Sequence, residues 1–301
     1  MTVDPLSQVI ALLRPRTVFS KVISGAGQWA VRYSRFGQPS FCVVLEGSCL
    51  LAVDGQQPLS LASGDFVLLP ATPGFTMTSL EPGTPVHIDA RAAATNTSGG
   101  EVRHGTRGGR PDVRMLGGYF EFDSPDSALL VSLLPAVVHV RGSERLPTLV
   151  GLVREESLER KAGRELILTR LVEVLLIEAL RGATGGPAAP GLLRGLADRR
   201  LAAAFRSMHG DPARAWTVEQ LARKSALSRS AFFDRFARAV GLPPMEYLMA
   251  WRIAIAKDLL RHTELAIAEV AERVGYGSAS TFSTAFSRHV GQPPGQYARM
   301  Q

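Results

Sequence analysis

Residues 232–247, FFDRFARAVGLPPMEY, return fifty residues later in altered form as residues 282–297, FSTAFSRHVGQPPGQY. Eight of the sixteen positions are identical, including both outer phenylalanines and the Gly-x-Pro-Pro turn. Upstream of each copy, apolar residues recur at the three- and four-residue spacing of an amphipathic helix. An internal repeat of this kind indicates two copies of one structural unit.

Each copy has the pattern of a helix, a tight turn and a second helix. In the second copy, residues 266–290, Gly275 ends the first helix and Ser278 is placed to cap the next. In the first copy, residues 217–240, Ala226 holds the position of Gly275. The sequence therefore predicts two helix-turn-helix units.

The segment between the two units, residues 245–261, contains no residue that breaks a helix. Its apolar residues follow helical spacing, as one buried face requires. A helix of this length measures about 26 Å at about 1.5 Å per residue. With a unit at each end, it can hold two recognition helices about 34 Å apart, which is one turn of DNA.

Charge is distributed unevenly along the chain of 301 residues, which carries 34 Lys+Arg and 27 Asp+Glu. The Pro/Gly-rich segment 182–191 separates two regions. Residues 1–189 hold 18 basic and 18 acidic side chains, whereas residues 190–301 hold 16 and 9. A basic domain attracts nucleic acid through counterion release, although a merely solubilising surface has the same composition.

The apolar segments do not predict a membrane span. The longest candidate, residues 166–180, contains Arg170, Glu173 and Glu178, whereas a spanning helix needs about 20 apolar residues. The N-terminal residues have an Asp and a Pro where a signal peptide has basic and then apolar residues. We expect a cytoplasmic protein that reaches the nucleoid through DNA binding.

Residues 198–299 resemble the DNA-binding domain of the AraC/XylS-type transcriptional regulators. The resemblance is carried by WTVEQLA, LSRSAFFDRF, PPMEYLMAWR, IAEVAERVGYGSASTFSTAF and GQPPGQY. It implies sequence-specific binding of double-stranded DNA and, if the protein is an activator, contact with RNA polymerase. Activation is the family's more frequent mode.

The resemblance also implies which residues contact DNA, because the second helix of each unit, residues 228–240 and 278–290, is the recognition helix. The candidates for reading bases are Arg229, Ser230, Phe233, Asp234, Ala279, Ser280, Ser283 and Thr284. The candidates for contacting the DNA backbone are Arg223, Lys224, Ser228, Arg235, Arg238, Ser278, Arg288 and His289.

Two of these positions depart from the family pattern. Asp234 and Thr284 stand where the family often has an arginine that reads guanine. An aspartate accepts a hydrogen bond from cytosine instead, and a threonine is permissive. We therefore expect a different operator, with Arg235 supplying the displaced positive charge.

Residues 29–90 alternate short apolar runs with turn residues, which is typical of an all-β barrel or sandwich. We expect turns at Gly47, Gly55 and Gly64. The stretch LASGDFVLLP resembles a motif of the cupin jelly roll, so the resemblance extends to regulators with an N-terminal cupin domain. The predicted fold class is α+β multidomain, with a cupin-like jelly roll plus helices followed by an all-α double helix-turn-helix domain.

The histidine pattern of metal-binding cupins is absent, because Cys42 and Phe75 stand near positions where histidines are sought. We expect no metal, no cofactor and no enzymatic activity. The domain is interpreted as an effector pocket or a dimerisation scaffold, and Cys42, His87 and His139 are the candidate effector contacts. Cys42 and Cys49 are interpreted as buried thiols without a direct disulfide; an exposed redox-sensing thiolate is the alternative.

Four segments follow from these patterns: a cupin-like regulatory domain at 1–145, amphipathic helices at 146–181, a linker at 182–197 and the DNA-binding domain at 198–301. The helices are expected to form a homodimer, with simple packing on the barrel as the alternative. The sequence favours a transcription factor with a small-molecule effector. A cupin enzyme with a fused DNA-binding anchor and a non-specific architectural DNA protein are the competing hypotheses.

Overall fold

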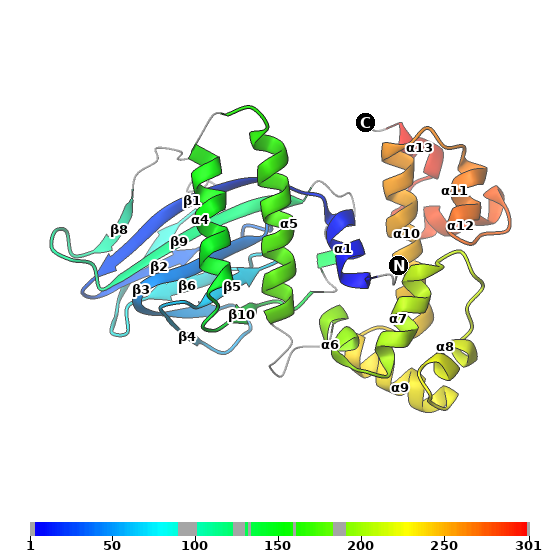
Figure 1. The fold of residues 1–301 in the computed structure, drawn as a ribbon, viewed down its shortest axis with the longest axis horizontal. Helices are drawn as coiled ribbons and strands as arrows, with labels where there is room; N and C mark the ends of the chain where they lie inside the picture. The colour runs from blue at the N-terminus through cyan, green and yellow to red at the C-terminus, as the bar shows by residue number, and fades with distance from the viewer. Residues whose placement is uncertain are drawn as a thin grey trace. The chain divides into compact units, whose positions relative to one another are not determined.

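Strands from the first half of the chain form a barrel, and helices from the last third form a separate compact unit (Figure 1). The computed structural model describes residues 4–89, 101–122, 130–131, 134–158, 161–182 and 191–299. The barrel unit comprises residues 15–122 and 136–186, and the helical unit comprises residues 1–14, 123–135 and 187–301. The predicted fold class is confirmed.

The barrel is built from two sheets that share one long strand. Within the described ranges, its strands are β1 (Pro15–Ala26), β2 (Trp29–Tyr33), β3 (Ser40–Val53), β4 (Leu59–Ala62), β5 (Phe66–Leu69), β6 (Phe75–Thr78), β7 (Pro82–Ile88), β8 (Val102–Gly105), β9 (Val113–Phe122) and β10 (Val138–Val140). One sheet has the order β8-β1-β9-β3-β5-β10, and the other has the order β7-β2-β6-β3-β4. The start of β3 pairs in the first sheet and its end pairs in the second, so β3 turns the corner between them.

Gly47 does not lie in a hairpin turn, contrary to the prediction, because β3 runs through it without a break. A β-bulge just before it shifts the register against β9, and its φ is +77°. A Cβ here would lie 1.8 Å from the carbonyl oxygen of Asp112, so the close strand approach requires glycine. Gly55 and Gly64 do lie in turns, as predicted.

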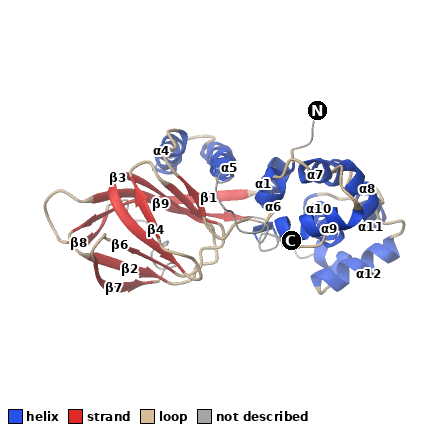
Figure 2. Cartoon of the chain, turned by 90° about the horizontal axis from the view of Figure 1, so that it is seen from below, coloured by secondary structure: helices blue, strands red, loops and turns tan. Residues whose placement is uncertain are grey.

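Two helices, α4 (Arg145–Leu158) and α5 (Arg164–Gly182), cover the outer face of the sheet that contains β1 and β9 (Figure 2). They coincide with the amphipathic segment predicted at residues 146–181. Their buried side chains include Val150 and Val153 of α4, and Leu168, Val172 and Leu175 of α5. Packing on the barrel therefore accounts for one apolar face of each helix.

The helical unit contains the described helices of the last third of the chain. They are α6 (Leu192–Ala197), α7 (Leu201–Gly210), α8 (Val218–Lys224), α9 (Arg229–Val240), α10 (Pro244–His262), α11 (Ile267–Arg273), α12 (Ala279–Val290) and α13 (Pro294–Ala298). Half of the predicted linker, residues 182–197, lies outside the described ranges, and its last part is α6. Leu192 and Leu193 are buried, so this part of the segment packs as core.

The N-terminal helix α1 (Pro5–Leu13) also belongs to the helical unit. Asp4 caps it by accepting a hydrogen bond from the backbone N–H of Leu6. The apolar face of α1 contacts α7 and α10 and buries Val9, Ile10 and Leu13. The barrel therefore starts at Pro15, later than the predicted boundary at residue 1, because this apolar face is covered by the helical unit.

No helix within the described part of the chain is long and apolar enough to cross a membrane.

Candidate DNA interface and effector pocket

Both helix-turn-helix units form where the repeat predicts them. In the first unit, Thr217 caps α8 through a reciprocal pair of hydrogen bonds with Gln220, and Ser228 caps α9 by accepting from the N–H of Ala231. In the second unit, Ser278 caps α12 by accepting from the N–H of Thr281. In each unit, the serine that precedes the second helix therefore satisfies one of the backbone donors left free at the helix start.

The turn in each unit passes through a residue with left-handed backbone. Gly275 has φ of +81°, and its counterpart Ala226 has φ of +51°. A Cβ on Gly275 would lie 2.3 Å from the carbonyl oxygen of Ala213, whereas the first unit tolerates alanine at this position. The alignment of Ala226 with Gly275 in the sequence repeat therefore reflects one shared turn geometry.

The phenylalanines of the repeat form the core of each unit. Phe232 and Phe236 are fully buried in the first unit, as are Phe282 and Phe286 in the second. α10 is continuous over 19 residues, which corresponds to about 28 Å at about 1.5 Å per residue. Trp251 of this helix is buried, as predicted.

The predicted base-reading residues lie on the outer faces of α9 and α12. In α9, Ser230 and Asp234 are exposed, and 42% of the surface of Phe233 is accessible. In α12, Ser280 and Thr284 are exposed, whereas Ala279 and Ser283 are half-buried. The Thr284 hydroxyl donates to the carbonyl oxygen of Ser280, so it is turned back along the helix.

Two of the predicted arginines are paired within the unit. Arg229 lies 2.8 Å from a carboxylate oxygen of Glu219, which holds it against α8. Arg235 lies 2.5 Å from the carboxylate of Asp198. Partial burial of Asp198 opposes its ionisation, but the hydrogen bond from Arg235 and two backbone N–H groups hold the pKa of this carboxyl below its usual range.

The remaining backbone candidates are spread over both units. Arg223 and Lys224 are exposed at the end of α8, and Arg238 and Arg288 are exposed in the last turns of the two recognition helices. His289 is also exposed, and its ring contacts the sulfur of Met249. Exposed cations at these positions are available to phosphates, which fix the register of a protein on DNA.

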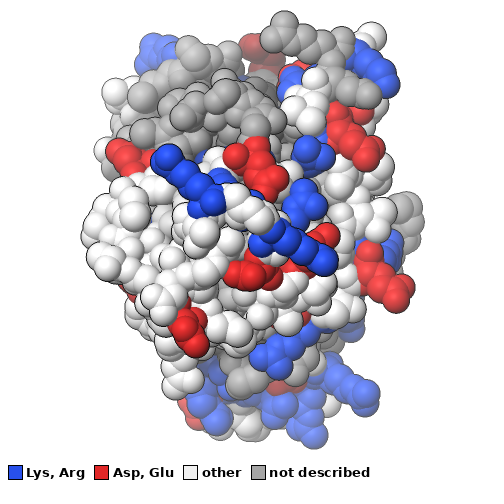
Figure 3. Space-filling view, turned by 90° about the vertical axis from the view of Figure 1, so that its left-hand side faces the viewer, with Lys and Arg blue, Asp and Glu red and all other residues white. Residues whose placement is uncertain are grey.

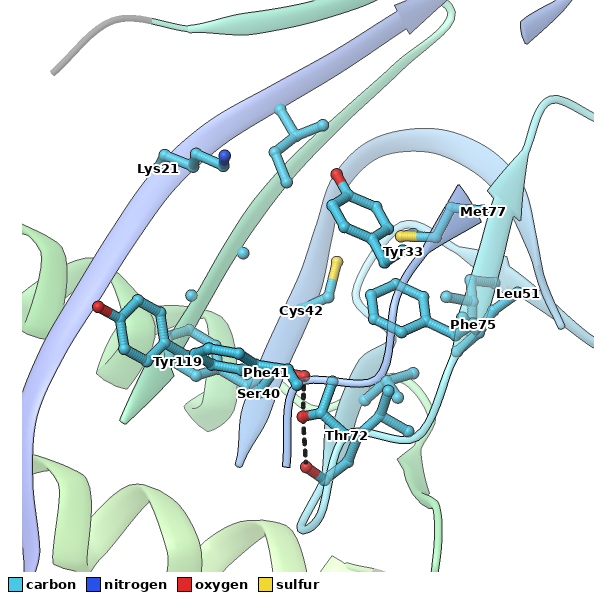
Figure 4. Close-up of a pocket in the computed structure, with 17 residues that line it drawn as sticks. Lys21, Tyr33, Ser40, Phe41, Cys42, Leu51, Thr72, Phe75, Met77 and Tyr119 are labelled. Atoms are coloured by element: carbon cyan, nitrogen blue, oxygen red, sulfur yellow. Dashed lines mark hydrogen bonds between the residues drawn. The ribbon is translucent and has the colours of Figure 1, made fainter. Parts of the chain in front are cut away.

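The interior of the barrel contains a cavity of about 110 Å³ between the two sheets (Figure 4). Its walls are mostly apolar. The lining residues are Lys21, Ile23, Tyr33, Phe36, Ser40, Phe41, Cys42, Leu51, Leu61, Val67, Leu69, Thr72, Phe75, Met77, Gly117, Gly118 and Tyr119. An apolar cavity with a few polar groups is the usual form of a small-molecule site.

Lys21, Gly117 and Cys42 form one row across the neighbouring strands β1, β9 and β3. Gly117 is the register partner of Lys21 on one side and of Cys42 on the other. Directly opposed residues of antiparallel strands point to the same face of a sheet. Because Gly117 has no side chain, space remains between the lysine and the cysteine, and this space is part of the cavity.

The opposite wall is aromatic. The rings of Tyr33 and Phe75 stack with centroids 4.8 Å apart. Burial, with a smaller contribution from the nearby Cys42, raises the pKa of Tyr33 to about 12, so its hydroxyl stays neutral and can donate a hydrogen bond. At another side, the Thr72 hydroxyl lies 2.7 Å from that of Ser40 and also donates to the carbonyl of Gln38.

Only one of the three predicted effector contacts, Cys42, lines the cavity. His87 is exposed on β7, and His139 on β10 pairs with the carboxylate of Asp65 at 3.1 Å. Their isolated positions in the sequence carried no information on which face they occupy. Lys21 and Tyr33, which do line the cavity, were not among the predicted contacts.

The two cysteines lie on the same strand, β3, and both are free. Burial is the main cause that raises the pKa of each thiol, and the pKa of Cys49 rises to about 12. Cys49 is fully buried and contacts the sulfur of Met115. The interpretation as buried thiols therefore fits the structure better than a reactive thiolate does. Among the described residues, no group of three or more His, Cys, Asp or Glu side chains is placed to hold a metal ion.

The surface of the barrel does not concentrate positive charge on the face drawn in Figure 3. Basic and acidic side chains lie interspersed in the centre of this view. The sequence assigns equal numbers of both to residues 1–189. The excess of positive charge therefore lies in residues 190–301, which contain the two recognition helices.

Comparison with known proteins agrees with this division. Residues 4–184 match the model of a cupin family, and residues 221–300 match that of a helix-turn-helix domain. A putative AraC-like transcription regulator of Streptomyces lividans is 38% identical over 303 residues, with 98% of each chain covered. RclR of Escherichia coli, an RCS-specific HTH-type transcriptional activator, is 25% identical, with 98% of this chain and 96% of RclR covered.

Solved structures include a similar DNA-binding domain. That of AdpA, in complex with a target DNA, is 29% identical and covers 32% of this chain and 87% of its own, with a TM-score of 0.31. A cupin barrel followed by two helix-turn-helix units defines a transcriptional regulator with a separate DNA-binding unit. The chain belongs to the AraC/XylS-type transcriptional regulators.

Proposed function

We propose that α9 and α12 enter successive segments of one major groove and read an operator that this regulator recognises specifically. The observation that carries this proposal is the division of each recognition helix into two faces. The four phenylalanines shared by the repeat, Phe232, Phe236, Phe282 and Phe286, face the core, while residues such as Asp234 and Thr284 remain on the exposed face. Two such faces joined by one continuous helix suit paired major-groove contacts better than non-specific binding.

Selection of genomic fragments with the purified chain, followed by footprinting at two salt concentrations, tests this function. The expected result is two protected major-groove segments about 34 Å apart, with binding that persists over competitor DNA. Uniform weak binding that disappears as salt increases would instead support the non-specific architectural protein.

We propose that the barrel senses a small-molecule effector in its cavity. The support is the position of the cavity, which opens between the two sheets of the cupin unit, and its apolar lining with few polar groups. The same lining gives no support to the competing cupin enzyme. We therefore propose that the barrel carries no reaction of its own.

We further propose that the regulator is a homodimer formed through α4 and α5. These helices pack inward on the barrel yet leave large apolar side chains exposed, namely Leu152, Leu158, Leu166, Ile167 and Val174. Exposed apolar side chains grouped on two neighbouring helices are typical of a protein interface. Sedimentation of the full chain tests this, because V174R should shift a dimer to monomer while A11S on α1 should not.

We propose that the regulator activates transcription by contacting RNA polymerase. We expect it to act in the cytoplasm, at the nucleoid. The support for activation is the relative RclR, which is named a transcriptional activator. Transcription in vitro from a footprinted promoter, with and without the regulator, distinguishes activation from repression.

A further inference from the structure

Phe233 lies on the outer face of α9, although its side chain is a large apolar ring. It is the most exposed large apolar side chain among the described residues of the helical unit, ahead of Met245 and Met249 on α10. Its neighbours Phe232 and Phe236 are fully buried, so the core of the unit is complete without a third ring from this helix. Single apolar residues are common on protein surfaces. The position of Phe233 on the helix therefore decides what it can contact.

That position is the part of a helix-turn-helix unit that approaches base edges. The second helix of such a unit lies in the major groove, and its N-terminal residues contact the bases. Phe233 is the fifth of the twelve residues of α9. It follows Ser230 by three positions, and Asp234 follows Ser230 by four, so the three side chains share one face of the helix. All three are exposed.

The charged residues near this face favour DNA over a protein partner. Arg223 and Lys224 are exposed at the end of α8, and Arg238 is exposed further along α9. The core of a protein interface is depleted of charged residues, whereas Asp234 directly follows Phe233 in the chain. Cations that flank a groove-facing helix instead neutralise phosphates. We therefore take duplex DNA as the partner of this ring.

The chemistry of the ring selects one base. In the major groove, thymine alone presents an apolar group, which is its C5 methyl. A phenyl ring has no hydrogen-bonding group, so it cannot pair with the polar edges of guanine, adenine or cytosine. Placed against such an edge, it would displace water from a group that it cannot satisfy, which costs free energy. The ring therefore favours thymine by contact and disfavours the other bases by desolvation.

We propose that Phe233 reads a thymine of the operator by packing its ring against the C5 methyl group. This inference rests on the proposed sequence-specific binding of DNA and names one base that the first unit requires. In the repeat, the counterpart of Phe233 is Ser283, which is half-buried and carries a hydroxyl group. The two recognition helices therefore differ at this position, and the operator should not be a simple repeat of one half-site.

Synthetic operators that carry deoxyuridine in place of one thymine test the proposal, because this change removes the methyl group alone. Each thymine of the two protected segments is replaced in turn, and binding of the full chain is titrated at one fixed salt concentration. At one thymine, the loss of the methyl should weaken binding about fourfold, as expected for one buried methyl group. A cytosine in place of this thymine should weaken binding further, and 5-methylcytosine should recover part of the loss.

Variants of Phe233 connect this difference to its side chain. F233A should bind the thymine and deoxyuridine duplexes with equal affinity, because alanine does not reach the methyl group. F233S, which introduces the residue of the second unit, should behave in the same way. M245A removes an exposed apolar side chain outside the recognition helices and should keep the fourfold difference. A fourfold difference that persists in F233A and F233S, or a parent chain that responds to no thymine methyl, would overturn the proposal.

The same titrations separate this proposal from the DNA-binding function on which it rests. A chain that binds its operator over competitor DNA but responds to no thymine methyl contradicts the reading of thymine and leaves specific binding standing. A chain that binds all duplexes equally, and loses this binding as salt increases, contradicts the specific function and the reading of thymine together.

Discussion

The Nε2 atom of His209 lies 2.7 Å from the hydroxyl oxygen of Tyr247, and both side chains are buried in the helical unit. The other ring nitrogen, Nδ1, lies 2.9 Å from the side-chain oxygen of Gln8 on α1. The ring also stacks on Trp251 with a centroid distance of 4.1 Å. A single histidine thus connects α1, α7 and α10.

The buried histidine should make the helical unit sensitive to acid. Burial lowers the pKa of His209 to about 3, although the nearby Asp4 acts in the opposite direction. In the unfolded chain a histidine has a pKa of about 6.5. Between these values the unfolded state binds the additional proton, so stability falls as the pH decreases from about 6.5 toward 3. The slope from this group is at most about 1.4 kcal/mol per pH unit.

Urea-induced unfolding at several pH values, followed by the fluorescence of Trp216 and Trp251 in a W29F background, measures this slope. H209Q should flatten the dependence of the free energy of unfolding on pH below 6.5. H289Q, which changes an exposed histidine of the same unit, should keep the original slope. Equal slopes for H209Q and the parent would show that His209 does not carry the effect.

The packing of α1 should contribute measurably to the stability of the helical unit. Leu13 is fully buried, so L13A is expected to reduce the free energy of unfolding by about 3 kcal/mol through lost burial and a residual cavity. L80A makes the same change at an exposed leucine of the barrel and should cost less than about 0.5 kcal/mol. Urea unfolding compares them, and a cost for L13A as small as that for L80A would contradict the packing of α1.

The two turns of the repeat should respond to opposite substitutions. A226G removes the strain of an alanine with left-handed backbone. Because glycine adds an entropic cost, the free energy of unfolding should rise by only about 0.5 kcal/mol. G275A should lower it by about 2 kcal/mol or more, since its Cβ meets the Ala213 carbonyl. A250G, within α10, is the control for a helical glycine and should cost about 1 kcal/mol. Thermal unfolding distinguishes the three, and a destabilising A226G would contradict the strain.

Base reading and phosphate contact should separate in binding assays. D234A should change the preferred base at its position and cost about 1–3 kcal/mol on the parent operator. R288A should weaken binding to all sequences about equally. It should also reduce the slope of the logarithm of the affinity against the logarithm of the salt concentration by about one. Selection from a randomised operator library, with titration at several salt concentrations, measures both. An unchanged base preference in D234A would remove Asp234 from the reading face.

The helix-turn-helix units could be predicted from the sequence because their determinants are local. The caps Thr217, Ser228 and Ser278 act within three residues of their own position, and the repeat supplies the alignment of Ala226 with Gly275. Such short-range patterns can be recognised in the sequence without any knowledge of tertiary contacts.

The cavity could not be predicted in the same way. Lys21, Gly117 and Cys42 are far apart in the sequence, and they meet only because the register of three strands places them in one row. The pair of glycines in MLGGYF is the one available signal, since glycine inside a strand often marks space for a ligand. Helix α1 was not among the predicted elements, and the helices that cover its apolar face, α7 and α10, lie far from it in the sequence.

The chain passes directly from α1 of the helical unit into β1 of the barrel. Residues 1–14 complete the helical unit, yet β1, which begins at the next residue, contributes Lys21 to the cavity. A fragment that starts after residue 186 lacks the helix that covers part of α7 and α10. Recombination at a single crossover therefore cannot exchange the complete DNA-binding half between two genes. An exchange between two regulators that preserves this packing must transfer both ends of the gene together.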